Sequence, residues 1–307
     1  MEKAKKIVVL GSSNTDMVVK SDQLPRPGET VLGGRFEMVP GGKGANQAVA
    51  AARLGADVTF VAKLGADLFG QDALRGLKAQ GLNTDFISID QQAASGVALI
   101  IVDEQGENCI SVASGTNGLI TPDDVDQAAG AIASASYLLV QLEIPLPAVS
   151  HAISLAKASD TPVILNPAPA CPLTDELLRQ VDIITPNQTE AELLTGIVVN
   201  GLESAQAAAV KLLERGVNTV IITMGSQGAY LHSKDLQQLV PTSPVKVVDT
   251  TAAGDTFNGA LTVALSEGMS LTDAVAFANR AAAYSVTRFG AQTSAPTREA
   301  LFTTNPS

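Results

Sequence analysis

The chain has 307 residues, of which 20 are basic and 31 acidic, so its formal net charge is −11. Hydrophobic residues make up 46% and charged residues 17%, which excludes disorder by composition and allows a large core without disulfides or metal ions. The acidity argues against binding to nucleic acid or to an anionic membrane surface, because both attract a basic face. It does not exclude a nucleotide, since a single phosphate site needs only local donors.

Cysteine content and the length of the apolar runs predict a cytoplasmic protein. The two cysteines, Cys109 and Cys171, are too few for a disulfide framework and have no metal-ligand spacing. The basic N-terminal residues are followed by only four apolar ones, at 7–10, which is too short for a signal peptide. The longest clean apolar run, at 97–102, is too short to cross a membrane.

Short apolar runs alternate with helical segments along most of the chain. Near-continuous apolar runs are typical of strands buried on both faces, and such strands are expected at 7–10, 58–62, 137–142, 163–165, 182–185 and 219–223. Helices, several with capping residues or a terminal glycine, are expected at 45–54, 70–80, 122–135, 148–158, 190–194 and 205–215. The alternation predicts a three-layer α/β fold with a mostly parallel central sheet, in a single domain of residues 1–307.

Two pairs of expected strands have no helix of their own. The first pair is 16–20 and 30–39, and the second is 96–103 and 108–114. Each pair looks antiparallel because turn-forming residues separate its members. We expect the four strands, within about residues 14–39 and 96–114, to form one small protruding sheet that acts as a lid or an interface.

Polar residues follow the first strand, in the segment 11–16. In open α/β sheets, ligands bind beyond the carboxyl ends of the strands, so Asn14 and Asp16 are well placed. A carboxylate beside an amide, with few aromatic residues nearby, suits a polyol better than an apolar substrate. Both residues are also ordinary turn formers.

A glycine-rich turn at 41–48 places Lys43 and Asn46 together at the start of a helix. The segment is not a P-loop, because Gly44 follows the lysine where Ser or Thr must bind magnesium. It also fails the dinucleotide fingerprint, since Gln47 stands where the third glycine is required. The turn suits hydroxyl or phosphate binding, although a flexible entry into a helix is an equal alternative.

Three more strand ends carry polar or glycine residues. Glu143 follows the strand at 137–142, and taken alone it is a solvated loop charge. Asn187 and Glu190 form either a capping box or, through Glu190 and a water, part of a magnesium–phosphate cluster. The glycines within 223–228 would let a nucleotide lie close to the backbone.

The strongest local signal is the segment 249–261, which follows a strand-like run at 245–248 and starts a helix near Thr256. Small residues at a helix start let the backbone approach a ligand, and the first free N–H groups favour an anion there. An acid at this point, Asp255, fits the chemistry if it accepts a proton from a hydroxyl that attacks phosphorus. The alternative is that Asp255 only caps the helix.

Taken together, these motifs resemble the ribokinase family, the PfkB group of carbohydrate kinases, over essentially the whole chain. Residues 42–48 are the more specific signature, whereas residues 252–255 resemble a motif shared across the wider group. Many relatives have glycine where Ala252 stands, and alanine there is usual in ribokinases. The alanine therefore makes the chain resemble ribokinases more specifically than the wider PfkB group.

The resemblance implies a central sheet between helix layers, a lid that commonly pairs with a second subunit, and phosphorylation of the 5-hydroxyl of D-ribose by ATP with Mg²⁺. It implies Asp255 as base and backbone N–H groups of Ala252, Ala253 and Gly254 around the transferred group. The implied sugar-binding residues are Asn14, Asp16, Gly42, Lys43, Asn46, Glu143 and Asp255. The implied nucleotide-binding residues are Asn187, Glu190, Thr223, Gly225, Ser226, Gly228, Gly254 and Asn279.

Family resemblance also implies a potassium site and leaves alternatives for the substrate. The potassium ligands, several through carbonyl groups, would be Asp249, Thr251, Ser285, Arg288, Gly290 and Ser294. Relatives often have histidine in place of Asn279. The alternative substrates are 2-deoxyribose, a hexose or a nucleoside, and the alternative of another class is a non-catalytic sugar sensor, against which the presence of Asp255 counts.

Overall fold

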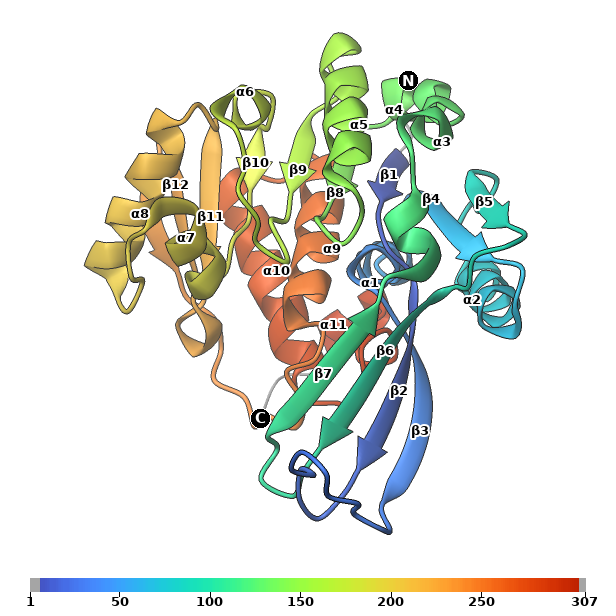
Figure 1. Ribbon diagram of the computed structural model, residues 1–307. Coiled ribbons are helices and arrows are strands. Elements are labelled where there is room, and N and C mark those ends of the chain that lie inside the picture. The colour runs from blue at the N-terminus through green and yellow to red at the C-terminus, as the bar shows by residue number, and fades with distance from the viewer. Residues whose placement is uncertain (1–5, 304–307) are drawn as a thin grey trace.

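The computed structural model describes residues 6–303, which form a nine-stranded sheet with helices on both faces and a separate four-stranded sheet (Figure 1). The strand order of the large sheet is β13-β12-β11-β10-β9-β8-β1-β4-β5. Strands from β5 to β11 are parallel to their neighbours, and β12 and β13 extend the sheet in antiparallel fashion. The strands are β1 (Lys6–Leu10), β4 (Asp57–Gly65), β5 (Ile87–Asp90), β8 (Tyr137–Val140), β9 (Val163–Leu165), β10 (Ile183–Ile184), β11 (Thr219–Thr223), β12 (Ala229–Ser233) and β13 (Gln237–Val240).

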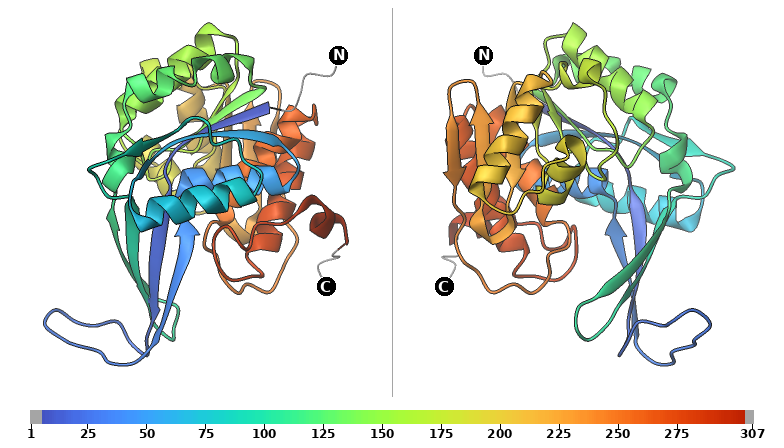
Figure 2. Two further views of the ribbon diagram at one scale, coloured as in Figure 1. Left: turned by 90° about the vertical axis from the view of Figure 1, so that its right-hand side faces the viewer. Right: turned by 60° about the vertical axis from the view of Figure 1, so that its left-hand side comes forward.

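Two helix layers cover this sheet because its strands point successive side chains to opposite faces (Figure 2). In β1, Ile7 and Val9 pack into one hydrophobic core, whereas Val8 and Leu10 pack into the other. The first core lies under α1 (Lys43–Arg53), α2 (Leu68–Ala79), α9 (Ala253–Ser266), α10 (Leu271–Ser285) and α11 (Arg298–Thr303). The second lies under α3 (Pro122–Asp126), α4 (Ala129–Ser134), α5 (Leu146–Ala158), α6 (Asp175–Leu178), α7 (Gln188–Thr195) and α8 (Leu202–Glu214). Among residues 6–303, no helix is long and apolar enough to span a bilayer.

The predicted three-layer fold is confirmed, and three of the expected elements differ from those observed. The helix expected at 122–135 is two short helices, α3 and α4, because the chain tightens into a turn in which Ala128 N–H donates to Val125 O. The strand expected at 30–39 starts at Arg35, because Gly33 and Gly34 adopt positive φ. The run at 245–248 is a loop, since the chain leaves the sheet after Val240, and a β-branched run without a neighbouring strand is not a strand.

The small sheet, called the lid sheet from here on, has the order β3-β2-β6-β7 and protrudes from the main body (Figures 1 and 2). Its strands are β2 (Asn14–Lys20), β3 (Arg35–Gly41), β6 (Gly96–Val102) and β7 (Asn108–Ala113). The pairs β2–β3 and β6–β7 are antiparallel, as expected, and a parallel β2–β6 pairing joins them. Large apolar side chains are exposed on it, including Phe36, Met38, Leu99, Ile110 and Val112.

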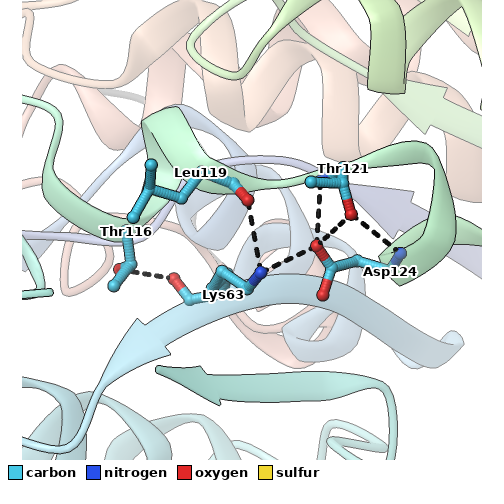
Figure 3. A network of polar contacts seen from close by, with 5 residues as sticks. All are labelled: Lys63, Thr116, Leu119, Thr121 and Asp124. Carbon is cyan, nitrogen blue, oxygen red and sulfur yellow. Dashed lines mark hydrogen bonds and ion pairs between the residues drawn. The ribbon is translucent and has the colours of Figure 1, made fainter. Parts of the chain in front are cut away.

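A polar network fixes the point where the lid sheet returns to the main body (Figure 3). The segment η1 (Gly115–Leu119) follows β7, and its Leu119 carbonyl accepts a bond from Lys63 Nζ of β4 at 3.2 Å. The same Nζ lies 2.8 Å from Asp124 Oδ2, and Thr116 Oγ1 donates to the Lys63 carbonyl at 2.9 Å. Burial opposes ionisation of Asp124, but the bonds from Lys63 and Thr121 outweigh it and lower the pKa of this carboxyl.

We expect Lys63→Met to lower the free energy of unfolding by about 1–3 kcal/mol, because it removes the cation paired with the partly buried Asp124 carboxylate, which keeps only its bonds from Thr121, and it removes the donor to the Leu119 carbonyl. Urea denaturation measures the change. The matched control is Lys157→Met, whose ion pair with Asp182 is longer, at 3.6 Å, and more exposed. Lys157→Met should lower the free energy of unfolding by at most about 1 kcal/mol. Equal losses in the two variants would show that the Lys63 network is an ordinary surface pair.

Candidate functional site

The polar residues predicted from the sequence meet where the parallel strands end and helices α1 and α9 begin. Asn46 of α1 reaches Asp255 of α9, with Asn46 Nδ2 donating to Asp255 Oδ2 at 3.0 Å. Glu143 follows β8 and reaches the start of α1, where its Oε2 accepts from the Lys43 N–H at 3.0 Å. Residues more than 200 positions apart in the chain therefore share one site.

Asp255 is a buried carboxylate in the first turn of α9, with a side chain that is bonded across to α1. It is 6% exposed. Its Oδ2 accepts from Asn46, and its Oδ1 accepts from Gln47 Nε2 at 3.0 Å. The helix has no side-chain cap, and the capping position is Ala252, with a φ of 57°. The interpretation of Asp255 as a mere helix cap is therefore wrong.

The ionisable groups of the site are four carboxyls and one lysine. Burial raises the pKa of Asp255 against the opposing effects of Lys43 and the two amide bonds. Burial also raises the pKa of Glu190. Burial, together with the charges of Glu143 and Asp255, raises the pKa of Asp16 to about 6. Burial disfavours the ammonium of Lys43, but the surrounding carboxylates outweigh that effect and raise its pKa. A raised pKa makes a carboxylate a better proton acceptor, provided that it is ionised.

Glu143 is tied into the main body and is not a solvated loop charge. Its Oε2 accepts from Ser12 Oγ at 2.5 Å as well as from the Lys43 N–H at 3.0 Å. Lys43 begins α1 directly after Gly42, whose φ of 88° favours glycine. A Cβ on Gly44 would lie 2.6 Å from the backbone of Gly11, so a P-loop serine or threonine could not fit there. The glycine-rich turn is therefore a close-packed corner that orients Lys43 and Asn46.

Asn14 and Asn46 leave polar groups for a ligand. Asn117 Nδ2 donates to Asn14 Oδ1 at 2.7 Å, which directs the Asn14 amide nitrogen elsewhere. Asn46 Oδ1 is buried and has no hydrogen-bond partner. Buried polar atoms are normally paired, so this oxygen fits the hydroxyl of a bound polyol. A cavity of about 420 Å³ lies against Asn14, Asn117 and Glu143.

A second, polar cavity of about 210 Å³ is lined by Asp255. Its lining residues include some predicted at the transferred group, some predicted to bind the nucleotide, and Lys43, which is predicted to bind the sugar. These are Lys43, Asn187, Glu190, Thr223, Ala252, Ala253, Gly254 and Asp255. Asp255 thus lines this second cavity, called the phosphate cavity from here on after the role predicted for it, while its partner Asn46 has an unpaired acceptor.

Asn187 and Glu190 form the capping box of α7 and also line that cavity. Asn187 Oδ1 accepts from Glu190 N–H at 2.8 Å, and Glu190 Oε2 accepts from Asn187 N–H at 2.9 Å. The structural and the functional interpretations of these two residues are therefore compatible. Thr223 ends β11, and the turn η2 (Gly225–Gln227) contains the predicted Gly225 and Ser226 and is followed by Gly228. Both glycines adopt positive φ.

Asn279 lies apart from the phosphate cavity, in a groove of about 670 Å³ between α10 and the loop 241–248. Its amide is buried and donates to Val240 O at 2.8 Å, at the end of β13. Ala276, Ala283 and Tyr284 line the same groove. Because the side-chain nitrogen of Asn279 is bonded to Val240 O, its predicted contact with a nucleotide depends on the side-chain oxygen, Oδ1.

The segments predicted to bind a monovalent cation lie side by side. Asp249 joins them, because its Oδ1 accepts from Thr251 N–H at 2.8 Å and its Oδ2 from Gly290 N–H at 2.9 Å. These bonds outweigh burial and lower the pKa of Asp249. The hydroxyls of Ser285 and Ser294 donate to nearby carbonyls and keep lone pairs for a cation. Arg288, whose guanidinium donates to the Tyr284 carbonyl, would offer a cation only its backbone oxygen. Within residues 6–303 no three His, Cys, Asp or Glu side chains cluster as metal ligands.

Four residues of this site escaped the sequence analysis as ligands or supports: Ser12, Gln47, Asn117 and Gln141. One signal was available. Gln141 is a polar residue inside the apolar run 137–142, and a polar residue that breaks a buried pattern often marks a functional site. Asn117 lies in η1, where nothing in the sequence indicates that it reaches Asn14.

Comparison with known proteins agrees with this geometry. Residues 4–298 match the pfkB family carbohydrate kinases. The chain is 45% identical to a ribokinase of Haemophilus influenzae, over 96% of each chain, and 38% identical to a deoxyribokinase of Salmonella typhimurium, over 95% of this chain and 96% of that one. The structure of an Arabidopsis thaliana ribokinase complexed with ribose and ATP superposes with a TM-score of 0.89, at 33% identity over 97% of this chain and 98% of that one. The chain therefore belongs to the pfkB family of carbohydrate kinases.

Proposed function

We propose that this protein transfers the γ-phosphoryl group of ATP to the 5-hydroxyl of D-ribose, forming D-ribose 5-phosphate and ADP. The observation that carries the proposal is the placement of Asp255, a buried carboxylate that lines the phosphate cavity and is bonded to Asn46. The curated relatives named ribokinase and the structure with ribose and ATP support the same substrates.

In the proposed reaction, Asp255 accepts the hydroxyl proton as the sugar oxygen attacks phosphorus. Asn46 and Gln47 hold the two carboxylate oxygens in place. The charged Lys43, whose pKa is raised by the surrounding carboxylates, lines the phosphate cavity and offsets the charge of the transferred group. Asn14 and Asp16, at the start of β2, present an amide and a carboxylate to the sugar hydroxyls.

The N-terminus of α9 supplies the electrostatic part of the proposal. Backbone N–H groups at residues 252–254 would bond to the transferred group at the positive end of the helix. Ala253 N–H donates to Thr250 O at 3.2 Å in this structure, so its contribution requires the turn at 250–252 to move. Closure of the lid sheet would exclude water and so suppress hydrolysis of ATP.

Mg²⁺ fits the phosphate cavity, which offers the oxygens of Glu190 and Asn187. This ion prefers oxygen ligands, retains several waters and takes most of its remaining ligands from the substrate phosphates. When bound with ATP, it would neutralise charge on the phosphates.

A 2-deoxyribose substrate is the second candidate, because the chain is also 38% identical to a deoxyribokinase. The two sugars differ by one hydroxyl, so a site that bonds that hydroxyl would reject the analogue that lacks it. Rates with ATP on ribose, 2-deoxyribose, hexoses and nucleosides distinguish these activities. Absence of phosphorylation across the panel, with sugar binding retained, would indicate a sugar sensor.

We expect Asp255→Asn to lower kcat for ribose by at least about 10²-fold, the usual scale of general acid–base catalysis. The amide is nearly isosteric with the carboxylate, so the affinity for ribose should stay almost unchanged. Steady-state rates give kcat, and calorimetric titration with ribose gives the affinity. Near-normal turnover in this variant would remove Asp255 from the role of base.

The proposal includes activation by a monovalent cation, with K⁺ well ahead of Na⁺. A cation bound between 249–251 and 285–294 would fix the turn that leads into 252–254, so its effect should fall on kcat. The assay measures ribose phosphorylation with Mg²⁺ and ATP as tetramethylammonium salts, titrated with KCl at constant ionic strength. A flat rate in protein shown to be free of K⁺ would contradict the cation site and leave the kinase proposal intact.

We also propose that the protein is a cytoplasmic homodimer formed through the lid sheet, whose exposed apolar side chains a symmetric partner would cover. Light scattering should then give twice the chain mass of 31.5 kDa at micromolar protein. Leu99→Glu on β6 should dissociate the dimer, because Leu99 is 55% exposed on the lid sheet. The control is Leu193→Glu on α7, which is 69% exposed outside the lid sheet and should leave the mass unchanged. A monomeric wild-type chain would contradict the dimer.

A further inference from the structure

We infer that Gln47 and Gln141 are positioning residues, which act in sequence: Gln141 fixes the orientation of the Gln47 amide, and Gln47 holds the carboxylate of Asp255. The inference rests on the proposed function, because it assigns a purpose to the group that holds the base.

Gln47 uses its whole side-chain amide inside the protein. It lies on α1 and is fully buried. Its Nε2 donates to Asp255 Oδ1 and to Asn166 Oδ1, each at 3.0 Å. Its Oε1 accepts from Gln141 Nε2 at 2.6 Å, and Gln141, which directly follows β8, is fully buried as well. An amide nitrogen has two hydrogens, so both donors of Gln47 are engaged.

These partners allow only one orientation of the Gln47 amide. Turned by 180°, the amide would place Oε1 against the Asp255 carboxylate and Nε2 against the Gln141 donor, two repulsive contacts in a buried place. Asn166 reinforces the same choice, because its Nδ2 donates to Thr185 O at 3.1 Å and its Oδ1 is thereby directed to Gln47. Gln141 therefore donates to Gln47, and Gln47 donates in turn to Asp255 and to Asn166.

Gln141 lowers the stability of the fold, and this indicates that its amide is retained for a role in the site. Its Oε1 is buried without a hydrogen-bond partner. A Cβ on Gly11 would lie 2.0 Å from that oxygen, so the glycine also makes room for it. An unpaired buried acceptor destabilises a protein, and an apolar residue in an otherwise apolar run would avoid that cost. The amide of Gln141 gives one benefit that an apolar residue cannot, the bond to Gln47.

Gln47 affects both the orientation of the Asp255 carboxylate and its ionisation. The groups that face this carboxyl are Lys43 and Asn46 on α1, Asp16 on β2, Glu143 after β8 and Glu190 on α7. Burial and the like charge of Glu143 favour the protonated acid, whereas Lys43 and the two amides favour the carboxylate. Loss of the Gln47 donor should therefore raise the pKa of Asp255. The base must be ionised to act, so the acid limb of the rate profile should move to higher pH.

The test compares Gln47→Met and Gln141→Met with the wild-type enzyme in full pH profiles of kcat and kcat/KM for ribose. Gln47→Met should lower kcat about tenfold or more at pH 7, keep KM for ribose within about threefold, and move the acid limb up by about one pH unit. Gln141→Met should also lower kcat and move the acid limb to higher pH, by smaller amounts than Gln47→Met, although Gln141 does not contact Asp255. In the double variant, the Gln141 change should add almost nothing, because it acts through Gln47.

The matched control is Thr161→Val, which removes another buried hydrogen bond, from Thr161 Oγ1 to Ile132 O at 2.9 Å, on the opposite helix layer. It should lower the melting temperature and leave the acid limb in place. A second readout needs no turnover: carbon-13 NMR of labelled aspartate, with the Asp255 signal assigned by its loss in Asp255→Asn, follows the ionisation of this carboxyl directly. Its midpoint should rise in both glutamine variants.

Two results would overturn the inference: an unmoved acid limb together with an unmoved Asp255 midpoint in the glutamine variants, or additive effects in the double variant. If Gln47→Met does not fold, Gln141→Met with the NMR titration still decides. Failure of the proposed function is a separate outcome, since the wild-type enzyme would then not phosphorylate ribose while the Asp255 midpoint could still be measured.

Discussion

A carboxylate buried at the N-terminus of α9 constrains the rest of the site. Burial raises the pKa of Asp255 and so favours its protonated form, and the surrounding donors and cation oppose this effect. The donors come from α1, and the charge comes from Lys43 on the same helix. The chemistry proposed for the protein therefore depends on how closely α1 and α9 approach each other.

Glycines set that distance. A Cβ on Gly259 of α9 would lie 2.7 Å from the Gln47 carbonyl oxygen, and one on Gly44 of α1 would lie 2.6 Å from the turn after β1. Any larger residue at either place would push α1 away from α9 or from the sheet. The amides of Asn46 and Gln47 would then no longer reach Asp255. Backbone packing and electrostatics are thus coupled in the same few residues.

The lid sheet is connected to the site at both ends. At its root, Asn117 of η1 bonds to Asn14, while Lys63 holds η1 and α3 against β4. Farther along β2, the ammonium of Lys20 lies 4.8 Å from the centre of the Phe289 ring, in the loop that Asp249 joins to the start of α9. A movement of the lid sheet would therefore displace both the residues proposed to bind the sugar and the loop proposed to bind a cation.

Local apolar patterns and turn residues were sufficient to predict the layers of the fold, the lid sheet and the approximate positions of its strand pairs. The sequence also indicated Asp255, Lys43 and Asn14, since each stands at a strand end or helix start, whereas Glu143 was implied only by the family resemblance. The groups that hold these side chains in place became visible only in the folded protein. Gln47, Gln141 and Asn117 act through bonds that span about 100 residues or more, and no local pattern encodes such a distance. The run at 245–248 shows the same limit, because a strand needs a neighbouring strand that the sequence pattern cannot supply.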